Sequence, residues 1–300
     1  MKVNIIGGGM AGLFTAWYLL RAGQDVVLID KGECGGGATH DAAGMLAPVN
    51  EIEFTELELL HAGLKSRDMY PDVAAELGDI GLDRNGTLEI GLTGDDGRYL
   101  KRLFDFQKEQ GLPVEWLTGP NVRSAESFLS HKIPSAIWSP EDIRVDNRLL
   151  AQQLRRDCLA RGMELHEHET ALGWQRDSSG EVGVETPSKM LWADALVVAC
   201  GTGTFEKSPL PYRIYPVRGE MVALTPPQLP FLEKTIRIRN TVLGNAYIVP
   251  KRDRILLGST SEEKGPHPVN SAGGLLDILR KCYAAVPGVY ELDVQATWAG

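Results

Sequence analysis

Residues 3–30 read VNIIGGGMAGLFTAWYLLRAGQDVVLID. Residues 3–6 are mostly apolar and predict a short strand. Residues 10–21 contain helix-forming residues with apolar positions at helical spacing and predict a helix. Gly23 is typical of a helix C-terminus, and residues 26–29 form the continuous apolar run expected of a strand buried on both faces of a parallel sheet. The stretch therefore predicts a βαβ unit.

The turn between the first strand and the helix, residues 7–12, has the GxGxxG spacing of a dinucleotide-binding loop. We expect Gly7 to permit the tight turn, Gly9 to let a pyrophosphate approach the backbone, and Gly12 to let the helix pack closely on the strand. The helix N-terminus offers N–H groups to the phosphates. Asp30, at the end of the second strand, is placed to accept hydrogen bonds from ribose hydroxyls. A purely structural glycine turn is the alternative, and the motif alone does not separate FAD from NAD.

The rest of the chain predicts an α/β protein of two interleaved domains. Residues 1–82 and 143–212 are expected to form a Rossmann-like nucleotide-binding domain. Residues 83–142 and 213–300 are expected to form a mostly antiparallel-sheet (α+β) domain. The expected elements beyond residue 30 are helices at 55–77, 146–162 and 272–286 and strands at 86–91, 133–138, 164–168, 182–185, 195–200, 220–224, 235–238, 246–249 and 255–258.

Composition excludes several classes of protein. With 43% hydrophobic and 24% charged residues, the chain has an ordinary globular composition. A net charge of −9 argues against a nucleic-acid partner, because phosphate binding needs a basic face. We expect no membrane span, because no apolar run approaches about 20 residues, and no secretory signal. Four widely spaced cysteines predict reduced thiols and a cytoplasmic location rather than a disulfide framework or a zinc site.

The chain resembles the glycine oxidase branch of the FAD-dependent D-amino-acid oxidase family. Five segments carry the resemblance, in the family's order. They are the glycine loop up to Asp30-Lys31, residues 37–48 (GATHDAAGMLAP), residues 193–201 (ADALVVACG), residues 215–220 (YPVRGE), and residues 247–260, which contain YIVP at 247–250 and ILLGST at 255–260.

The resemblance implies FAD as the cofactor. In the family, the segment matching residues 37–48 passes under the flavin and the pyrophosphate, and its small residues let the backbone lie against a flat ring. A tight packing loop is the alternative reading of that segment. The implied FAD-binding residues are Gly7, Gly9, Met10, Ala11, Gly12, Asp30, Lys31, Ala38, Thr39, Ala43, Gly44, Met45, Ala47, Ala171 and Gly201.

Two further side chains are candidates for the catalytic site. Tyr247 matches the family tyrosine whose hydroxyl helps to hold the substrate carboxylate, although core packing is the default for an aromatic on a strand. His40 either lies beside the flavin or is an ordinary loop histidine. No metal site is predicted. His166 and His168 share a face of an expected strand, but no third ligand accompanies them.

The function implied by the resemblance is FAD-dependent oxidative deamination of a small amino acid: glycine, sarcosine or a D-amino acid. Hydride transfer to flavin N5 and hydrolysis then give an oxo acid, ammonia and hydrogen peroxide, and a role in thiamine biosynthesis is compatible with this. The expected partners are the amino-acid substrate and either oxygen or an electron-transfer acceptor. Whether the protein forms a homo-oligomer is left open. The alternatives are a D-amino-acid dehydrogenase and a non-catalytic FAD-binding relative.

The chain departs from the family pattern in three places, one of which is His40, where relatives often have a small polar residue. The chain stops at residues 298–300, where the family continues into an Arg-Pro element that supplies a carboxylate-binding arginine. A C-terminal segment of the FAD domain follows that element in the family. We therefore expect a longer form of this protein to contain both; a reduced relative of the family is the alternative. Ser261 replaces an apolar side chain of the family, so the substrate pocket is expected to differ.

Overall fold

The structure is a computed structural model that describes residues 1–52, 54–203, 214–242, 244–265 and 268–300. Its internal contacts divide the chain into two compact units, each assembled from three segments. The first unit contains residues 1–42, 77–80 and 147–216, and the second contains 43–76, 81–146 and 217–300. The predicted domain boundary between residues 212 and 213 lies outside the described residues.

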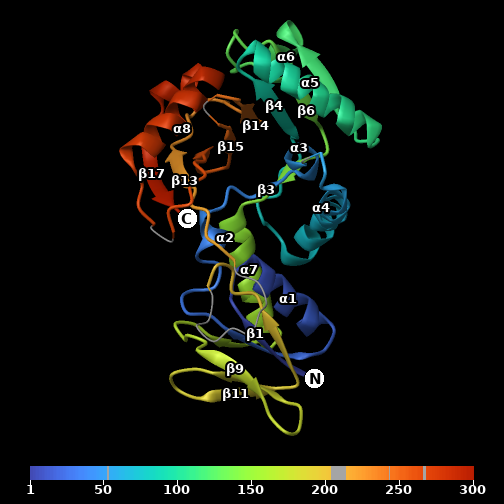
Figure 1. The fold of residues 1–300 in the computed structure, drawn as a ribbon, viewed down its shortest axis with the longest axis vertical. Helices are drawn as coiled ribbons and strands as arrows, with labels where there is room; N and C mark the ends of the chain where they lie inside the picture. Colours follow the sequence, from blue (N-terminus) through green and yellow to red (C-terminus); the bar gives the residue numbers. More distant parts are fainter. Residues whose placement is uncertain (53, 204–213, 243, 266–267) are drawn as a thin grey trace. The chain divides into compact units, whose positions relative to one another are not determined.

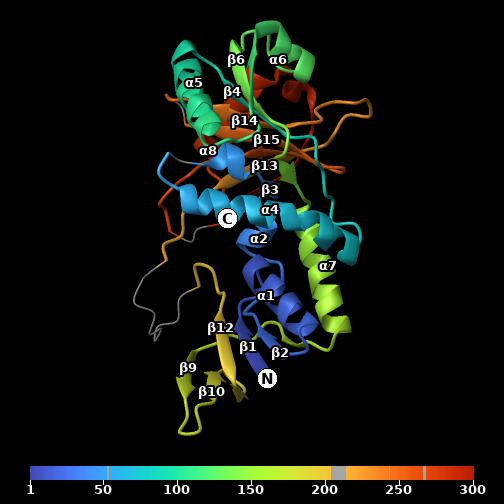
Figure 2. The ribbon, with the colours of Figure 1, turned by 90° about the vertical axis from the view of Figure 1, so that its right-hand side faces the viewer.

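A four-stranded parallel sheet forms the centre of the first unit, in the order β12-β1-β2-β8. Figure 2 shows β12, β1 and β2 side by side. Ile5 and Leu28, from adjacent strands, have no exposed surface, as expected for a parallel sheet covered on both faces. The strands are β1 (Lys2–Ile6), β2 (Asp25–Ile29), β8 (Glu164–His166) and β12 (Ala195–Val198).

Two helices pack together beside this sheet, α1 (Met10–Arg21) and α7 (Asn147–Ala160) (Figure 1). Trp17 of α1 is almost completely buried, and its indole Nε1 donates to the Asp157 carboxylate of α7 at 2.9 Å. The first unit also contains a short helix and a small antiparallel sheet: α2 (Ala38–Asp41), β9 (Gly173–Arg176), β10 (Val182–Glu185) and β11 (Met190–Ala193).

The second unit is built on an eight-stranded sheet in the order β17-β13-β16-β15-β14-β4-β6-β5. Its neighbouring strands are antiparallel except for β4 and β14, which are parallel. The strands are β4 (Thr87–Gly91), β5 (Glu115–Thr118), β6 (Ser135–Ser139), β13 (Glu220–Leu224), β14 (Thr235–Arg239), β15 (Ala246–Pro250), β16 (Ile255–Gly258) and β17 (Val294–Ala299).

The two faces of this sheet carry different side chains, because successive residues of a strand point to opposite faces. On one face, Ile236 and Ile248 pack with Ile278 of α8 (Ala272–Ala285) in the largest hydrophobic cluster. On the other face, Tyr247 and Met221 pack with a second, smaller cluster. The first face of the sheet therefore forms the hydrophobic core, and the second face is the one that can carry a functional site.

The remaining elements of the second unit cover the sheet and its edges (Figure 1). A two-stranded sheet joins residues near position 45 to residues near position 143. The bounds are β3 (Met45–Leu46), α3 (Pro48–Glu51), α4 (Leu57–Leu77), α5 (Gly94–Glu109), α6 (Gly119–Ala125), β7 (Ile143–Arg144) and the 3₁₀ helix η1 (Pro287–Glu291).

The expected helices and strands are all present within a few residues, but several further elements were not predicted. The additional elements are the helices α2, α3, α5 and α6, the 3₁₀ helix η1 and the strands β3, β5, β7, β9, β11 and β17. The strand predicted for residues 164–168 was too long: it ends at His166, and His168 has a left-handed φ of 57°. His166 and His168 therefore do not share a strand face.

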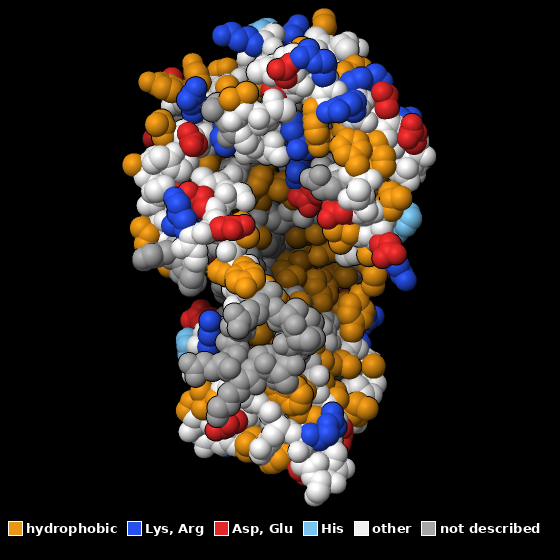
Figure 3. All heavy atoms as spheres, viewed as in Figure 1, with side chains coloured by type: hydrophobic (Ala, Val, Ile, Leu, Met, Phe, Trp, Pro, Cys, Tyr) orange, Lys and Arg blue, Asp and Glu red, His pale blue; other side chains and the backbone are white. Residues whose placement is uncertain are grey.

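The charged side chains follow no single-sign pattern on the face that Figure 3 draws, where acidic and basic groups are interspersed. Among the described helices, none combines the length and the apolar character that crossing a membrane requires.

Candidate functional site

The glycine-rich turn has the steric features expected of a dinucleotide-binding loop. Gly7 has a φ of 104°, and a Cβ there would overlap the carbonyl oxygen of Ala199 at the end of β12. A Cβ on Gly12 would overlap the carbonyl oxygen of Gly7. Both glycines are therefore needed for α1 to lie directly against β1.

The N-terminus of α1 begins at a residue without a side chain. Gly9 is the N-cap residue, no side chain caps it, and a Cβ there would meet only the Thr39 hydroxyl oxygen, at 3.3 Å. The first turn of a helix leaves N–H groups without intrahelical partners and carries the positive end of the helix dipole. The Met10 amide donates to Thr39 Oγ1 at 2.9 Å, which brings two predicted FAD-binding residues together.

Asp30 lies where the sequence placed it, at the end of β2, and its carboxylate is fixed by backbone amides. Its Oδ2 accepts from the Gly8 amide at 2.6 Å, and its Oδ1 accepts from the Gly32 amide at 2.7 Å. Each carboxylate oxygen keeps a further lone pair with which to accept from a ribose hydroxyl. A helix N-terminus whose N-cap residue has no side chain, a side-chain-free approach at Gly9 and an oriented carboxylate fit the pyrophosphate and ribose of FAD.

The other predicted FAD-binding residues of the first unit surround this loop. Ala38 begins α2, the helix that carries Thr39. Lys31 directly follows Asp30 and is exposed. Ala171 packs against the hydrophobic cluster of the parallel sheet, and Gly201 follows β12 in a turn with a φ of 58°. Contact of these residues with FAD stays a prediction.

His40 is exposed, and its Nδ1 lies 3.0 Å from the carboxylate of Asp41. The loop around it is held by α7, since the Asn147 side-chain amide donates to the carbonyl oxygens of Thr39 at 2.6 Å and of His40 at 3.2 Å. A place for the imidazole beside the flavin stays a prediction. Within the described part of the chain, no group of three or more His, Cys, Asp or Glu side chains is arranged to hold a metal ion.

The predicted flavin-contacting residues Ala43, Gly44, Met45 and Ala47 belong to the second unit and form the 43–47 segment. Ala43 and Ala47 are buried, and Gly44 has a φ of 73°. The carbonyl oxygen of Gly44 accepts from the Val145 amide at 2.9 Å, and Met45 pairs with Arg144 across β3 and β7. The hydrogen bond to Val145 and the pairing of β3 with β7 hold this segment in place, and its contact with the flavin stays a prediction.

Tyr247 lies in a transverse row of side chains on the second face of the eight-stranded sheet. The strand registers place Arg237 opposite Tyr247, Tyr247 opposite Gly258, Gly258 opposite Met221, and Met221 opposite Trp298. Met45 and Ala43 pack on the same cluster. The sheet therefore brings Tyr247 together with the 43–47 segment.

The hydroxyl of Tyr247 donates to the thioether sulfur of Met221 at 3.1 Å. A thioether is a weak acceptor, so an ionised carboxylate would be a much stronger partner for this hydroxyl. Burial raises the pKa of Tyr247, and this effect outweighs the opposing hydrogen bond with Ser259 and the nearby charge of Arg237. The hydroxyl therefore remains a protonated donor at neutral pH.

Gly258 makes this position of Tyr247 possible. A Cβ on Gly258 would lie 2.7 Å from both Cε2 and Cζ of the Tyr247 ring and would overlap the sulfur of Met221. The ring therefore crosses strand β16 at the one residue that has no side chain. The sequence analysis did not identify Gly258, although it lies in a segment that carries the resemblance.

Two arginines of β14 lie on the same face as Tyr247, and neither was predicted from the sequence. Arg239 binds the buried Glu89 carboxylate through Nε at 3.0 Å and Nη2 at 2.6 Å. Arg237 binds Glu51 of α3 through Nη1 at 2.7 Å, and the Glu51 side chain is half exposed. The alternation of Arg237 and Arg239 with isoleucines was the signal that could have found them.

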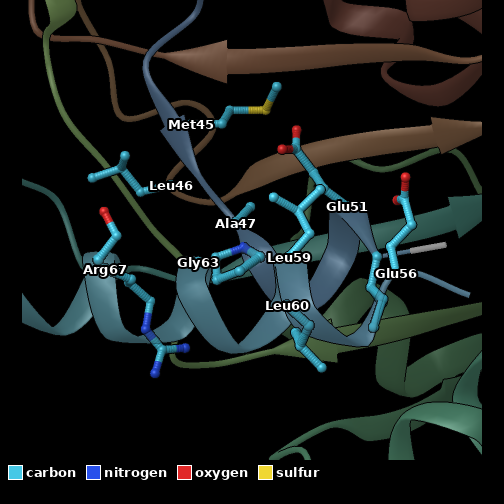
Figure 4. Close-up of a pocket in the computed structure, with 12 residues that line it drawn as sticks. Met45, Leu46, Ala47, Glu51, Glu56, Leu59, Leu60, Gly63 and Arg67 are labelled. Atoms are coloured by element: carbon cyan, nitrogen blue, oxygen red, sulfur yellow. The ribbon is translucent and has the colours of Figure 1, made fainter. Parts of the chain in front are cut away.

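A cavity of about 230 Å³ lies between the 43–47 segment and α4. Its lining comes from residues 45–52 and from α4 as far as Arg67 (Figure 4). The lining is mainly apolar, with carboxylates from Glu51 and Glu56. The guanidinium of Arg67 is held at 2.9 Å by Asp68 and at 3.1 Å by Glu141.

The helix α3, which carries Glu51, is anchored by buried polar groups. Asp142 has no exposed surface and accepts from the Asn50 side-chain amide at 2.5 Å and from the Val49 amide at 3.3 Å. The side-chain amide of Gln107 donates to the carbonyl oxygen of Val49 at 2.8 Å. Burial raises the pKa of Asp142 to about 7 despite these hydrogen bonds and the charge of Arg67.

Comparison with known proteins agrees with this geometry. The family profile described as "DAO: FAD dependent oxidoreductase" matches residues 2–300. Glycine oxidase of Geobacillus kaustophilus is 32% identical over 308 residues, which cover 99% of this chain and 80% of that protein. The putative thiamine biosynthesis oxidoreductase ThiO of Rhizobium etli is 30% identical, with 100% and 83% covered. The crystal structure of glycine oxidase from G. kaustophilus matches with a TM-score of 0.91 at 31% identity, covering 100% of this chain and 82% of that one.

A glycine-loop parallel sheet and a largely antiparallel sheet, interleaved in one chain, define the class: an FAD-dependent oxidoreductase. The chain belongs to the DAO family of these enzymes. The family, the α/β fold class, an enzyme of the amino-acid oxidase class and FAD as cofactor were all predicted from the sequence and are confirmed.

Proposed function

We propose that the protein oxidatively deaminates a small amino acid, with glycine the first candidate and sarcosine or a D-amino acid the next. The observation that carries the proposal is the hydroxyl of Tyr247, which is half-buried and protonated and donates to a weak thioether acceptor, with Ser259 as a second hydrogen-bond partner. Glycine oxidases at 27–32% identity that each match 99% of this chain support it.

Tyr247 holds one oxygen of the substrate carboxylate in this proposal. The Tyr247 hydroxyl gives up its hydrogen bond to Met221 and donates to the substrate carboxylate instead. This replacement favours binding strongly, because a charge-assisted hydrogen bond is stronger than one to sulfur. Arg237, directly opposite on β14, adds positive charge on the same face. The residues of this unit thereby orient the amino acid by its carboxylate, which leaves the amine and the Cα–H for the chemistry.

FAD held by these residues would supply the electron acceptor for oxidation of the substrate amine to an imine; hydrolysis of the imine would give an oxo acid and ammonia, and oxygen as the final acceptor would give hydrogen peroxide. The residues of the chain contribute by positioning the cofactor and the substrate. The α1 N-terminus and Asp30 are proposed to hold the pyrophosphate and ribose, and the small residues of the 43–47 segment to lie against the flavin. A substrate amine that is already deprotonated needs no strong base, so orientation is sufficient.

The test is reduction of the FAD-loaded protein by glycine, sarcosine and D-alanine without oxygen, followed by peroxide release when oxygen is admitted. Bleaching of the flavin absorbance by at least one of the three is expected. Bleaching without peroxide would indicate a dehydrogenase that uses another acceptor, and no bleaching by any of the three would contradict the proposal.

Tyr247→Phe tests the proposed role of the hydroxyl. Loss of one hydrogen bond to a charged group should raise the KM for the amino acid by about 10- to 100-fold. Tyr290→Phe, a matched change at an exposed tyrosine, should leave KM unchanged. Equal KM values for the two variants would contradict the assignment of Tyr247.

The proposal extends to a role in thiamine biosynthesis, supported by the name of the R. etli relative, a thiamine biosynthesis oxidoreductase. It also extends to a cytoplasmic location, supported by four free cysteine thiols, Cys34, Cys158, Cys200 and Cys282, which a reducing compartment maintains.

A further inference from the structure

We propose that Lys251 and Arg254 are positioning residues that hold the 43–47 segment, the predicted flavin contact, in its place. They act through residues 145–146, which both cations contact. The two cations lie at the two ends of the turn that joins β15 to β16, the hairpin that carries Tyr247. This inference rests on the proposed function in one respect, the contact of the 43–47 segment with the flavin.

A short turn brings the two cations together. The Lys251 amide donates to the carbonyl oxygen of Arg254 at 2.8 Å, which closes the turn. The ammonium of Lys251 donates to the carbonyl oxygen of Val145. The guanidinium of the buried Arg254 binds the Asp146 carboxylate through Nη2 at 2.8 Å and the Asp253 carboxylate through Nη1 at 2.7 Å. Two consecutive residues, 145 and 146, are therefore bound by one turn.

The residues bound by this turn are next to the backbone partners of the 43–47 segment. The Val145 amide donates to the carbonyl oxygen of Gly44 at 2.9 Å. Arg144 pairs with Met45 across β3 and β7. A displacement of Val145 would therefore be passed directly to Gly44, because a hydrogen bond tolerates only small changes in distance and angle.

Arg144 has an anchor of its own, so the turn controls Val145 in particular. The Arg144 guanidinium binds Asp83 through Nη2 at 2.7 Å and donates through Nη1 to Thr235 Oγ1 at 3.3 Å. The backbone of Arg144 pairs with that of Asp83 at 3.0 and 2.9 Å. Substitutions in the turn should therefore displace Val145 and Gly44 and leave the pairing of β3 with β7 in place.

The charged groups that face the Lys251 ammonium are Arg144 on β7, Asp146 after it, Asp83 before β4 and Arg254 in the turn itself. Burial lowers the pKa of Lys251 to about 7; the two arginines lower it as well, and the two carboxylates oppose these effects. Lys251 is therefore charged below about pH 7 and neutral above it, whereas a guanidinium stays charged. Since a charge-assisted hydrogen bond is stronger than a neutral one, the bond to Val145 should weaken as pH rises through about 7.

The flavin itself reports whether the segment moves. We expect the visible absorbance and circular dichroism of the FAD-loaded protein to change with pH, with a midpoint near pH 7. Lys251→Met keeps an unbranched apolar stem without the charge. Its flavin spectrum should not change in this pH range, and its dissociation constant for FAD should be about tenfold higher, because a hydrogen bond from a charged group is lost.

Two further lysine substitutions define the role of the charge. Lys251→Arg keeps a cation that does not titrate, so it should restore the affinity for FAD and retain the low-pH spectrum throughout. Lys108→Met is the matched control, because Lys108 is exposed in the last turn of α5. This control should show the FAD affinity and the pH dependence of wild type.

Asp142 also has a pKa raised to about 7, and it anchors α3 directly after the 43–47 segment. Asp142→Asn distinguishes the two groups, because the amide does not titrate. The spectral change near pH 7 should persist in Asp142→Asn and disappear in Lys251→Met.

Several outcomes would overturn the inference. They are a wild-type flavin spectrum that does not change near pH 7, a change that Asp142→Asn removes and Lys251→Met retains, and an FAD dissociation constant of Lys251→Met equal to that of wild type. A pH-dependent spectrum in Lys251→Arg would do the same, which keeps the test decisive if Lys251→Met does not fold.

These measurements use no amino-acid substrate, so they separate the inference from the proposed function. A flavin that responds to Lys251 but is not reduced by glycine, sarcosine or D-alanine would support the inference and contradict the proposed oxidation alone. Reduction by one of these amino acids in a protein whose flavin does not respond to Lys251 would contradict the inference alone.

Discussion

Tyr247 reaches Met221 across a strand because residue 258 has no side chain. The position of the Tyr247 ring is sensitive to displacements of a few tenths of an ångström in its neighbours. Protein interiors are close-packed, so that even one added methyl group shifts the surrounding atoms. Gly258 therefore determines where the Tyr247 hydroxyl lies, although it is not itself expected to touch the substrate.

Gly258→Ala should displace the Tyr247 ring and raise the KM for the amino acid about tenfold, because the hydroxyl would no longer meet the carboxylate at hydrogen-bond distance. Steady-state kinetics of the FAD-loaded variant measure this effect. The matched control is Gly273→Ala on α8, where an added Cβ meets no atom within 4 Å. A KM equal to that of wild type in Gly258→Ala would contradict the steric argument.

The stability of a helix depends on the hydrogen bonds that cap its N-terminus, and helices α5 and α6 differ in this respect. The N-cap of α5, Thr93, accepts from the Asp96 amide at 3.2 Å, and the Asp96 carboxylate accepts from the Thr93 amide at 2.9 Å, which completes a capping box. The neighbouring helix α6 also has a threonine N-cap, Thr118, but its side chain makes no capping hydrogen bond.

Thr93→Ala should lower the free energy of unfolding by about 1 kcal/mol, the usual cost of removing a threonine cap. Thr118→Ala should change it by much less, because no capping hydrogen bond is lost. Chemical denaturation of the two variants beside wild type measures both effects. A larger loss for Thr118→Ala than for Thr93→Ala would show that the caps are assigned wrongly.

The stability of the whole molecule should depend on pH through Asp142. Burial raises the pKa of Asp142 from its ordinary value to about 7 in the folded protein, so between about pH 4 and pH 7 the folded state holds a proton that the unfolded state has lost. The contribution of this group to stability is therefore fully present below its ordinary pKa and is lost as pH rises through about 7. The slope in that window is about 1.4 kcal/mol per pH unit.

Asp142→Asn should remove this pH dependence, because an amide does not titrate. The unfolding free energy of wild type relative to the variant should fall as pH rises from 4 to 7, as measured by denaturation at several pH values. Asp277→Asn, at an exposed residue of α8, should leave the pH dependence as in wild type. Parallel curves for wild type and Asp142→Asn would contradict the raised pKa.

The sequence by itself determined the βαβ unit, the glycine turn and the position of Asp30. These features are local, because a strand, a turn and a helix within 30 residues are set by side-chain periodicity and glycine sterics. The pattern of expected elements along the chain predicted the α/β fold class. The resemblance to a flavoenzyme family supplied FAD and Tyr247 as a candidate, since five separated segments matched in order.

Only the tertiary structure decided what surrounds Tyr247. Gly258, Met221 and Arg237 come from three other strands, and Glu51 comes from a helix 186 residues before Arg237. No sequence period links such positions, because they meet only through strand order and register, which depend on long-range pairing. The parallel pairing of β4 with β14 has the same origin, since it joins segments that the chain separates by more than a hundred residues.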